Sequence, residues 1–252
     1  MMWKVIAQSV TGTAHVATGR GCDDAHAWAL QQADGEPFFI ACASDGAGSA
    51  SQSATAANAV VQFVVNYLGN IVSRSQLPTA AQLMAMAEEV HMMLADMAVQ
   101  NNQPLCEYAC TMLGCVAYSG GGAWFQIGDG AIVRSGDGGQ YAAVWWPQNG
   151  EYLNTTTFIT DDDYLSNLLV SVSTDPVAEV AILTDGLQLL ALSMENSSAH
   201  QPFFRDVFRV LRMADTSDKV AVLQEKLGLF LNSEPVNART DDDKTLILAT
   251  IL

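Results

Sequence analysis

The sequence predicts an α+β fold in which strands and helices occur in separate blocks. Apolar runs of strand length stand at both ends of the chain. Two long segments with helical apolar spacing follow the first strands, and two more precede the last strand. Separate blocks of this kind, rather than strict alternation of strand and helix, are typical of α+β layers.

The N-terminal half contains three expected strands followed by two expected helices. The strands are predicted at residues 3–9, 25–31 and 38–43, and the helices at residues 49–68 and 79–99. Valines in the first helix, and leucines and methionines in the second, recur three or four residues apart and so share one face. We interpret the methionine stripe as core packing, because methionine commonly fills gaps in apolar interiors.

The C-terminal half returns to strands before two further helices. Strands are predicted at residues 108–117, 123–127, 131–134, 141–145, 178–183 and 245–252. Helices are predicted at residues 186–194, 202–213 and 217–231, with a loop-rich segment and one short helix at 146–175. No repeat or long linker interrupts this order, so residues 1–252 are expected to form a single domain.

The charge balance argues against nucleic-acid and membrane partners. The 252 residues include 27 acidic and 11 basic ones, for a formal net charge of −16. Such a protein repels nucleic-acid phosphates and anionic lipid at long range. No apolar run reaches the ~20 residues that a membrane helix needs. A phosphorylated substrate would therefore need local positive charge, which bound metal would supply.

Cysteine usage and the N-terminus indicate a cytoplasmic protein. The five cysteines show no paired spacing, which argues against both a disulfide framework and a zinc knuckle. Most of them lie in apolar surroundings that suit buried thiols in a reducing compartment. The first ten residues carry only a short, interrupted apolar stretch and so do not resemble a secretory signal.

Two aspartates follow apolar strands and precede helical patterns. Asp45-Gly46 ends the run at 38–44, and Asp185-Gly186 ends the run at 180–184. Asp-Gly between apolar runs often forms a hairpin turn, but that turn needs a second strand directly afterwards. Neither site offers one. A buried strand that ends in aspartate, with glycine allowing close backbone approach, favours a metal-binding corner.

Asp129 stands in a different context from these two aspartates. It lies between two strand-like runs, 123–127 and 131–134. A hairpin turn is a sufficient explanation of that pattern. From spacing alone, a ligand role for Asp129 and a plain turn both stay open.

Two triple-aspartate runs carry different expectations. Thr160 and residues 161–163 precede apolar positions at helical spacing, which suits a helix start with Thr160 as the cap. Residues 241–243 precede a strand, which needs no cap. Carboxylates clustered beside a buried strand repel one another unless cations hold them. The second run is therefore the better source of metal ligands.

A further acidic pair opens an early strand. Asp23 and Asp24 precede the strand at 25–31, and Arg20 stands just before them. Carboxylate ligands suit Mg²⁺ or Mn²⁺. The four histidines show no H-E-x-x-H spacing, and no G-x-S-x-G elbow is present. Spacing alone thus predicts an acidic metal site.

The order of motifs resembles the metal-dependent protein serine/threonine phosphatases of the 2C class, in particular a bacterial branch. That branch has the patterns G-T-S-H, C-Q-D-A, D-G-x-G, S-T with G-D-S, N-x-T-x-F-x-T, S-D-G-L and D-N/D-x-T. The matching segments are, in chain order, residues 12–15, 22–25, 45–48, 110–111 with 128–130, 154–160, 184–187 and 242–245. The match extends from about residue 10 to residue 250.

This resemblance implies a fold and a set of ligands. The fold is a four-layer αββα sandwich, with two antiparallel sheets flanked by helices and a flap-like segment within residues 146–175. By motif position, Asp45 bridges two ions, with the Gly46 carbonyl on one of them. The remaining implied roles are Asp185 and Asp242 on the first ion, Asp23 facing the second, Asp24 orienting bound waters, Asp129 serving a third and weaker ion, and Arg20 holding the substrate phosphate.

The resemblance also implies an activity and its partners. Such enzymes hydrolyse phosphoserine and phosphothreonine in proteins with Mn²⁺ or Mg²⁺, using a water between two ions as the nucleophile. The implied partners are a phosphoprotein substrate and a cognate serine/threonine kinase in a signalling pathway. The chain departs from the pattern at Ala47, where animal members have histidine, at Cys110, and at Arg20, which lies one residue nearer the acidic pair.

Two other functions stay open at this point. The departures at Ala47 and Cys110 are compatible with a non-catalytic, phosphatase-like domain that binds a partner in a signalling complex, although the metal aspartates are all present. A phosphoesterase that acts on a nucleotide or another small molecule is the third reading. A calcium-binding structural role has no support, because the chain has no D-x-[DN]-x-[DN]-G loop.

Overall fold

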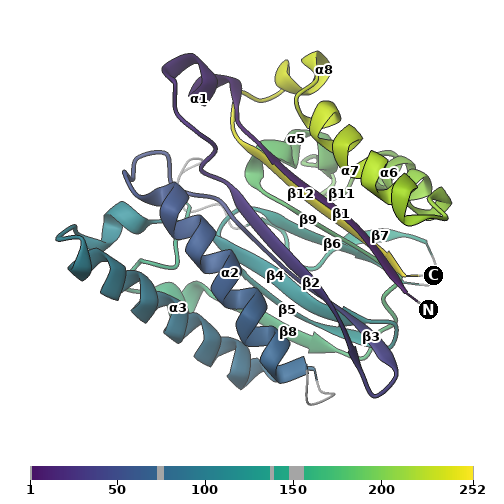
Figure 1. The fold of residues 1–252 in the computed structure, drawn as a ribbon, viewed down its shortest axis with the longest axis horizontal. Coiled ribbons are helices and arrows are strands. Elements are labelled where there is room, and N and C mark those ends of the chain that lie inside the picture. The colour runs from purple at the N-terminus through teal and green to yellow at the C-terminus, as the bar shows by residue number, and fades with distance from the viewer. Residues whose placement is uncertain (1, 73–76, 137–138, 148–155, 252) are drawn as a thin grey trace.

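The computed structural model describes residues 2–72, 77–136, 139–147 and 156–251 (Figure 1). Ten of its strands form two five-stranded antiparallel sheets. The strands are β1 (Trp3–Val10), β2 (Ala25–Ala33), β3 (Glu36–Ser44), β4 (Met112–Tyr118), β5 (Gly121–Ile127), β6 (Ala131–Ser135), β7 (Tyr141–Ala143), β8 (Leu169–Ser173), β9 (Glu179–Leu183), β10 (Leu192–Ser193), β11 (Ser198–Ala199) and β12 (Lys244–Ile251). The helical elements are α1 (Thr13–Thr18), α2 (Ser53–Val72), α3 (Ala80–Gln100), η1 (Leu105–Tyr108), α4 (Tyr164–Asn167), η2 (Asp185–Leu187), α5 (Gln188–Ala191), α6 (Gln201–Met213), α7 (Ser217–Leu231) and α8 (Glu234–Asn237).

The two large sheets pack face to face between two pairs of helices. One sheet has the order β1-β12-β9-β6-β7 and the other β2-β3-β4-β5-β8. Figure 1 shows α2 and α3 against the second sheet and α6 and α7 at the opposite side of the molecule. The four-layer αββα arrangement implied by the sequence is confirmed. Because β1 pairs with β12, the two ends of the chain lie next to each other.

Strand β3 shows why the strands of this fold lack a polar face. Successive side chains of a strand point to opposite sides. Phe39, Ala41 and Ala43 enter the core between the sheets, whereas Phe38, Ile40 and Cys42 enter the core beneath α2 and α3. Both faces of β3 are thus covered, and the apolar run in the sequence follows from that.

The outer helices each bury one face. In α2 the buried positions include Val60, Val61, Val64 and Leu68, as the helical spacing predicts. In α6, Phe204, Phe208 and Leu211 close a separate core over the first sheet. None of the helices in the described part of the chain combines the length and hydrophobicity that crossing a bilayer requires.

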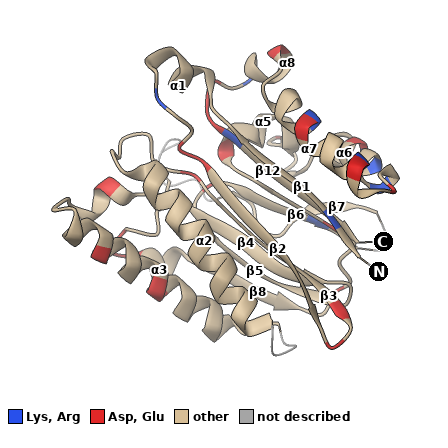
Figure 2. Ribbon diagram, in the orientation of Figure 1, with Lys and Arg blue, Asp and Glu red and all other residues tan. Residues whose placement is uncertain are grey.

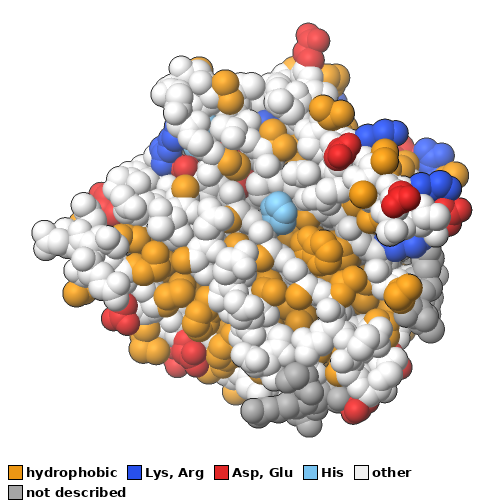
Figure 3. All heavy atoms as spheres, viewed as in Figure 1, with side chains coloured by type: hydrophobic (Ala, Val, Ile, Leu, Met, Phe, Trp, Pro, Cys, Tyr) orange, Lys and Arg blue, Asp and Glu red, His pale blue; other side chains and the backbone are white. Residues whose placement is uncertain are grey.

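Charge is mixed on the face that carries α6 and α7. Figure 3 shows Lys and Arg side chains gathered over these two helices, with acidic side chains among them. Two ion pairs account for part of that mixture, Arg209 with Asp206 at 3.5 Å and Lys219 with Asp215 at 2.7 Å. The two signs of charge are therefore interspersed on this face.

Several element boundaries differ from the sequence prediction for identifiable reasons. Helix α2 begins at Ser53 rather than at residue 49, and the backbone N–H groups of Ser51 and Gln52, just before it, donate to Glu107. Residues 105–108 form the 3₁₀ helix η1, so β4 begins later than expected. Helix α1 and strand β8 were not predicted. Helix α1 has no buried residue and therefore no apolar pattern in the sequence.

The predicted Thr160 cap is wrong. Helix α4 is only four residues long, its N-cap position is Asp163, and no side chain caps it. Asp161 instead accepts a hydrogen bond from the backbone N–H of Phe158 at 2.8 Å, and the buried Thr160 hydroxyl has no hydrogen-bond partner among the described residues. The acidic run thus directly precedes the helix without capping it through a side chain.

Of the two explanations left open for Asp129, the hairpin turn does not hold. Strands β5 and β6 belong to different sheets, and Asp129 lies where the chain crosses from one sheet to the other. A hairpin within one sheet and a crossing between two sheets show the same local pattern of strand, turn and strand. Which sheet each strand joins depends on pairing with distant parts of the chain.

Candidate metal centre

A cavity of about 170 Å³ lies where several strands of the two sheets begin or end. Five of its twelve lining residues are aspartates. The residues are His15, Asp45, Gly46, Ala47, Gly48, Thr111, Asp129, Thr156, Phe158, Asp185, Asp242 and Asp243. Of the ligands implied by the sequence, Asp45, Gly46, Asp129, Asp185 and Asp242 therefore come together in one place.

Strand register explains how segments so distant in the sequence meet. In one sheet the last residue of β3, Ser44, lies opposite the first residue of β2, Ala25. In the other sheet Leu183, the last residue of β9, lies opposite both Leu246 and Ala131. Acidic residues next to these positions consequently share one end of the sandwich. Figure 2 shows the acidic run at the start of β2, with a basic position before it in the chain that leaves α1.

Asp45, Asp129 and Asp185 form the centre of the cavity. One carboxylate oxygen from each lies within 4.8 Å of the others. Burial, with the nearby charges of Asp24 and Asp185, raises the pKa of Asp45 well above its ordinary value. Burial, with the charges of Asp129 and Asp242, raises the pKa of Asp185 to about 6. Such mutual destabilisation of carboxylates is what a bound cation relieves.

Gly46 provides the close backbone approach that the Asp-Gly pattern predicts. A Cβ at this position would lie 2.8 Å from backbone and side-chain carbons of Ser53 and 2.9 Å from the carbonyl oxygen of Asp23. The residue after Asp45 must therefore be glycine. The segment carrying Asp45 is held further by the hydrogen bond from its N–H to the Thr111 hydroxyl, at 2.8 Å.

Asp24 is buried behind the cavity. Its Oδ2 accepts hydrogen bonds from the hydroxyls of Thr184 and Thr245, at 2.7 and 2.8 Å. Burial outweighs these bonds and raises the pKa of Asp24 to about 8. Its Oδ1 has no partner among the described residues, and the same holds for Oδ1 of Asp185. A buried carboxylate oxygen without a donor indicates that a ligand or an ordered water completes the site.

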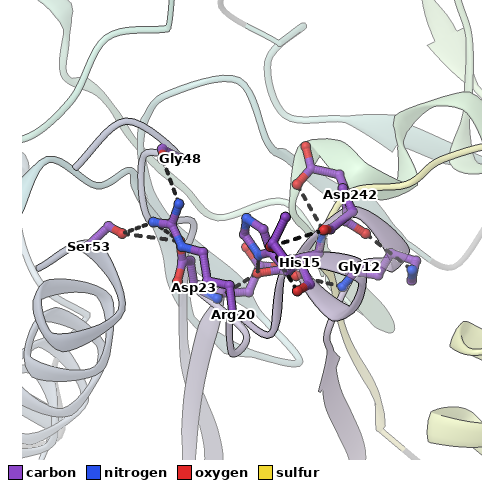
Figure 4. Close-up of polar contacts among 12 residues, drawn as sticks. Gly12, His15, Arg20, Asp23, Gly48, Ser53 and Asp242 are labelled. Carbon is purple, nitrogen blue, oxygen red and sulfur yellow. Dashed lines mark hydrogen bonds and ion pairs between the residues drawn. The ribbon is translucent and has the colours of Figure 1, made fainter. Parts of the chain in front are cut away.

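Asp23 and Arg20 contact each other beside the cavity. The Arg20 guanidinium lies 2.5 Å from Oδ2 of Asp23, which the hydroxyl of Ser53 also contacts at 3.2 Å (Figure 4). The same guanidinium donates to the carbonyl oxygens of Gly48 and Ala50. In this structure Arg20 is thus bonded within the chain and does not line the cavity.

Sequence reasoning missed Asp243 and His15. Asp242 lines the cavity, as expected, but its neighbour Asp243 joins three segments. Asp243 accepts hydrogen bonds from the backbone N–H groups of Gly12, at 2.6 Å, and Asp23, at 2.5 Å, and it contacts Nδ1 of His15 at 3.1 Å. In the sequence, the contact between His15 and Asp243 was signalled only by the motif at Gly12–His15, which did not indicate Asp243 as the partner.

A second group of potential ligand atoms lies within 4.8 Å of one another and comes from His15, Asp23 and Asp243. This group fits a metal less well than the cavity does. Both oxygens of Asp243 already accept hydrogen bonds from the chain, and Asp23 is paired with Arg20. By contrast, the cavity aspartates include an oxygen with no partner in the described residues. Carboxylate oxygens in that number fit a hard divalent cation.

Comparisons with known proteins agree with this geometry. Residues 11–232 match the family model described as protein phosphatase 2C. The chain belongs to the protein phosphatase 2C family. A curated relative, serine/threonine-protein phosphatase 3 of Escherichia coli (strain K12), is 38% identical over 255 residues, which cover 99% of this chain and 98% of the relative.

Two solved structures share the fold of this chain. PppA, described as a key regulatory component of T6SS in Pseudomonas aeruginosa, superposes with a TM-score of 0.62 at 17% identity, over 100% of this chain and 99% of that one. The serine/threonine phosphatase Stp1 from Staphylococcus aureus superposes with a TM-score of 0.60 at 17% identity, over 100% and 96%. Because the identities are low, these two comparisons bear on the fold alone.

Proposed function

We propose that this chain hydrolyses phosphoserine and phosphothreonine in proteins, with divalent ions held by its cavity aspartates. Membership of the protein phosphatase 2C family and 38% identity to a serine/threonine-protein phosphatase support this reaction. The observation that carries the proposal is the convergence of Asp45, Asp129 and Asp185 within 4.8 Å in an open cavity. A structural cluster would instead pair each carboxylate with a donor from the chain.

The proposed ligand roles are those that the motif positions imply. Asp45 is proposed to bridge two ions, with the Gly46 carbonyl beside it, and Asp185 and Asp242 are proposed to complete the first ion's shell. Asp129 is proposed for a third ion; its side chain also accepts a hydrogen bond from Thr156. Two buried aspartates do not line the cavity: Asp23 is proposed for the second ion, and Asp24 is proposed to orient bound water.

The bound ions and the side chains of the protein would contribute different parts of the reaction. When bound, divalent ions would activate a water for attack on phosphorus and offset the charge of the phosphoryl oxygens. The chain holds the carboxylates at one end of the sandwich and keeps them partly out of solvent. Asp24 offers a free oxygen, Oδ1, through which a water could be oriented. Mg²⁺ and Mn²⁺ are the ions that an all-oxygen site of this kind would take.

Arg20 is proposed to bind the substrate phosphate. Because its guanidinium contacts Asp23 at 2.5 Å, it would have to leave that partner to reach a phosphoryl oxygen. We expect Arg20→Lys to raise KM for a phosphothreonine peptide about tenfold, because a lysine cannot make the paired contacts of a guanidinium with phosphate. Steady-state kinetics together with a thermal melt would separate this effect from a loss of stability. An unchanged KM with a lower Tm would contradict the phosphate role.

The setting of the reaction is also part of the proposal. Three of the five cysteines are buried as free thiols, which supports a reducing, cytoplasmic location. We propose a phosphorylated protein as substrate, a cognate kinase acting in the opposite direction, and a role in bacterial signalling. The whole chain is proposed to act as one domain. Of the proposed flap within residues 146–175, residues 148–155 lie outside the described residues, whereas Thr156 and Phe158 line the cavity.

Hydrolysis of a phosphothreonine peptide with and without Mn²⁺ tests the proposal directly. We expect turnover with Mn²⁺ and none in the presence of a chelator. Mn²⁺ binding in a calorimeter without turnover on any phosphopeptide would favour the alternative, a partner-binding domain. Faster turnover of nucleotides than of phosphopeptides would favour a small-molecule phosphoesterase.

A further inference from the structure

The oxygen that leaves phosphorus needs a proton in this reaction. Displacement from a phosphoserine or phosphothreonine would otherwise release an alkoxide, a strong base, into an acidic cavity. General acids supply such protons when a titratable side chain lies within reach. A titratable side chain at the cavity is therefore needed as the acid.

The titratable residues that line the cavity are five aspartates and His15. Asp45, Asp129, Asp185 and Asp242 are the proposed metal ligands, and they bind cations as anions. Asp243 accepts hydrogen bonds from two backbone N–H groups and contacts His15, so it too acts as an acceptor. His15 is the lining residue whose side chain can carry a proton without giving up such a role.

We propose that His15, held by Asp243, donates the proton to the leaving seryl or threonyl oxygen. This inference rests on the proposed function and assigns a further catalytic residue to it. Nδ1 of His15 contacts Oδ2 of Asp243 at 3.1 Å, which leaves Nε2 as the ring nitrogen available to the cavity. Figure 4 shows the His15 ring in view between Asp23 and Asp242. An acceptor on Nδ1 fixes both the tautomer and the ring orientation.

The helix that carries His15 is held by several polar contacts. Helix α1 has no buried residue. Its start is attached to the segment before β12, because Gly12 N–H donates to the Asp243 side chain and Ala14 N–H donates to the Asp241 carbonyl at 3.0 Å. The His15 side chain is only 18% exposed, although it stands on a surface helix. These contacts hold the imidazole at the cavity rather than in solvent.

The proposed step balances as follows. Water adds to phosphorus and gives up one proton to solvent, while the bond from phosphorus to the seryl or threonyl oxygen breaks and its electron pair stays on the departing oxygen. The proton on Nε2 moves to this oxygen, which leaves as a free hydroxyl. The neutral imidazole then takes up a proton from solvent before the next turnover.

Substrates that differ in their leaving group test this role. Phosphothreonine peptide needs a proton on the leaving oxygen, phenyl phosphate needs it less, and p-nitrophenyl phosphate releases a stable anion. The two aryl esters share nearly the same shape. We expect His15→Gln to lower kcat/KM on the peptide roughly 100-fold or more, to lower it less on phenyl phosphate, and to leave p-nitrophenyl phosphate nearly unchanged.

His200→Gln is the matched control, because His200 is exposed and lies outside the cavity. It should leave all three rates unchanged. Glutamine at position 15 can still donate to Asp243 but has no proton to release, so a merely structural role of His15 would predict little loss. Equal losses on all three substrates, or no loss on any, would overturn the assignment.

Mn²⁺ binding measured by calorimetry separates this role from metal ligation. The His15→Gln variant should bind Mn²⁺ with unchanged affinity, because the proposed ligands are untouched. A weaker affinity would make His15 a metal ligand and would overturn the assignment. If the wild-type protein with Mn²⁺ hydrolyses none of the three substrates, the proposed function fails, and the role of His15 fails with it.

Discussion

The Asp45→Asn variant is expected to lose phosphopeptide hydrolysis almost completely, by more than ~100-fold at saturating Mn²⁺. Asp45 lies at the end of β3, where its carboxylate meets those of Asp129 and Asp185. As the proposed bridging ligand it has no substitute in the cavity, and asparagine keeps the shape while removing the charge. Steady-state rates on a phosphothreonine peptide, measured over a range of Mn²⁺ concentrations, check this expectation.

Asp162→Asn is the matched control for this variant. Asp162 is exposed in the turn before α4 and does not line the cavity. The same chemical change there should leave rate and metal affinity unaltered. Wild-type rates in the Asp45 variant at saturating metal would refute the ligand assignment, and weakened metal binding in the Asp162 variant would show that the wrong acidic run had been chosen.

The Asp45→Asn substitution should also make the metal-free protein more stable, and its stability should depend less on pH. The folded-state pKa values of Asp24, at about 8, Asp185, at about 6, and Asp45 all lie above the ordinary value of 3.8. The folded state therefore binds more protons than the unfolded state between about pH 4 and about pH 8, so stability falls as pH rises through this window. Thermal melts in chelator should show a lower Tm at about pH 8 than at about pH 5.

In Asp45→Asn this fall should be smaller, because one of the repelling carboxylates is gone. Divalent ions should reverse it in the wild-type protein, since binding to the folded state alone raises Tm. A wild-type Tm that rises over the same window in chelator would mean that the cavity carboxylates do not destabilise the metal-free fold.

The second large effect is expected at the glycine after Asp185. A Cβ on Gly186 would lie 2.0 Å from the carbonyl oxygen of Asp243, a backbone atom that cannot move without shifting the start of β12. We expect Gly186→Ala to destabilise the protein by about 3 kcal/mol or more, at the upper end of overpacking effects. It should also weaken metal binding, because Asp185 and Asp242 lie on the two segments that would be forced apart. Urea unfolding and metal titration measure the two effects.

Gly48→Ala is the appropriate comparison. Gly48 follows the other Asp-Gly pair and lines the cavity, but a Cβ there would have no atom within 4 Å. Its stability should stay close to that of the wild-type protein. If Gly186→Ala unfolded at the same urea concentration as Gly48→Ala, the close contact between the two segments would not be required for the fold.

Much of the fold followed from the residues themselves. The apolar spacing of α6 and α7 and the strand runs of β1 and β12 predicted these elements within a residue or two. The errors in element boundaries coincide with contacts to residues far away in the sequence. Just before the start of α2, for example, the backbone N–H groups of residues 51 and 52 donate to Glu107, a contact that the sequence did not indicate.

The site was predictable where a strand end marked it. Asp45 and Asp185 each follow a buried strand and precede glycine, a pattern that survives in the sequence because the glycine is sterically required. Asp129 carried no such mark, because a turn within one sheet and a crossing between two sheets have the same local pattern. His15 and Asp243 lie on segments about 230 residues apart, and their contact follows from the pairing of β1 with β12.

The sequence by itself determined the element types, the acidic strand ends and, through the order of its motifs, the family. These properties are written in short-range patterns of hydrophobicity, glycine and aspartate. Folding decided which carboxylates share the cavity, that Arg20 pairs with Asp23, and that His15 lines the cavity while it contacts Asp243. The physical reason is that these contacts depend on strand register and sheet stacking, which bring together side chains that no local pattern relates.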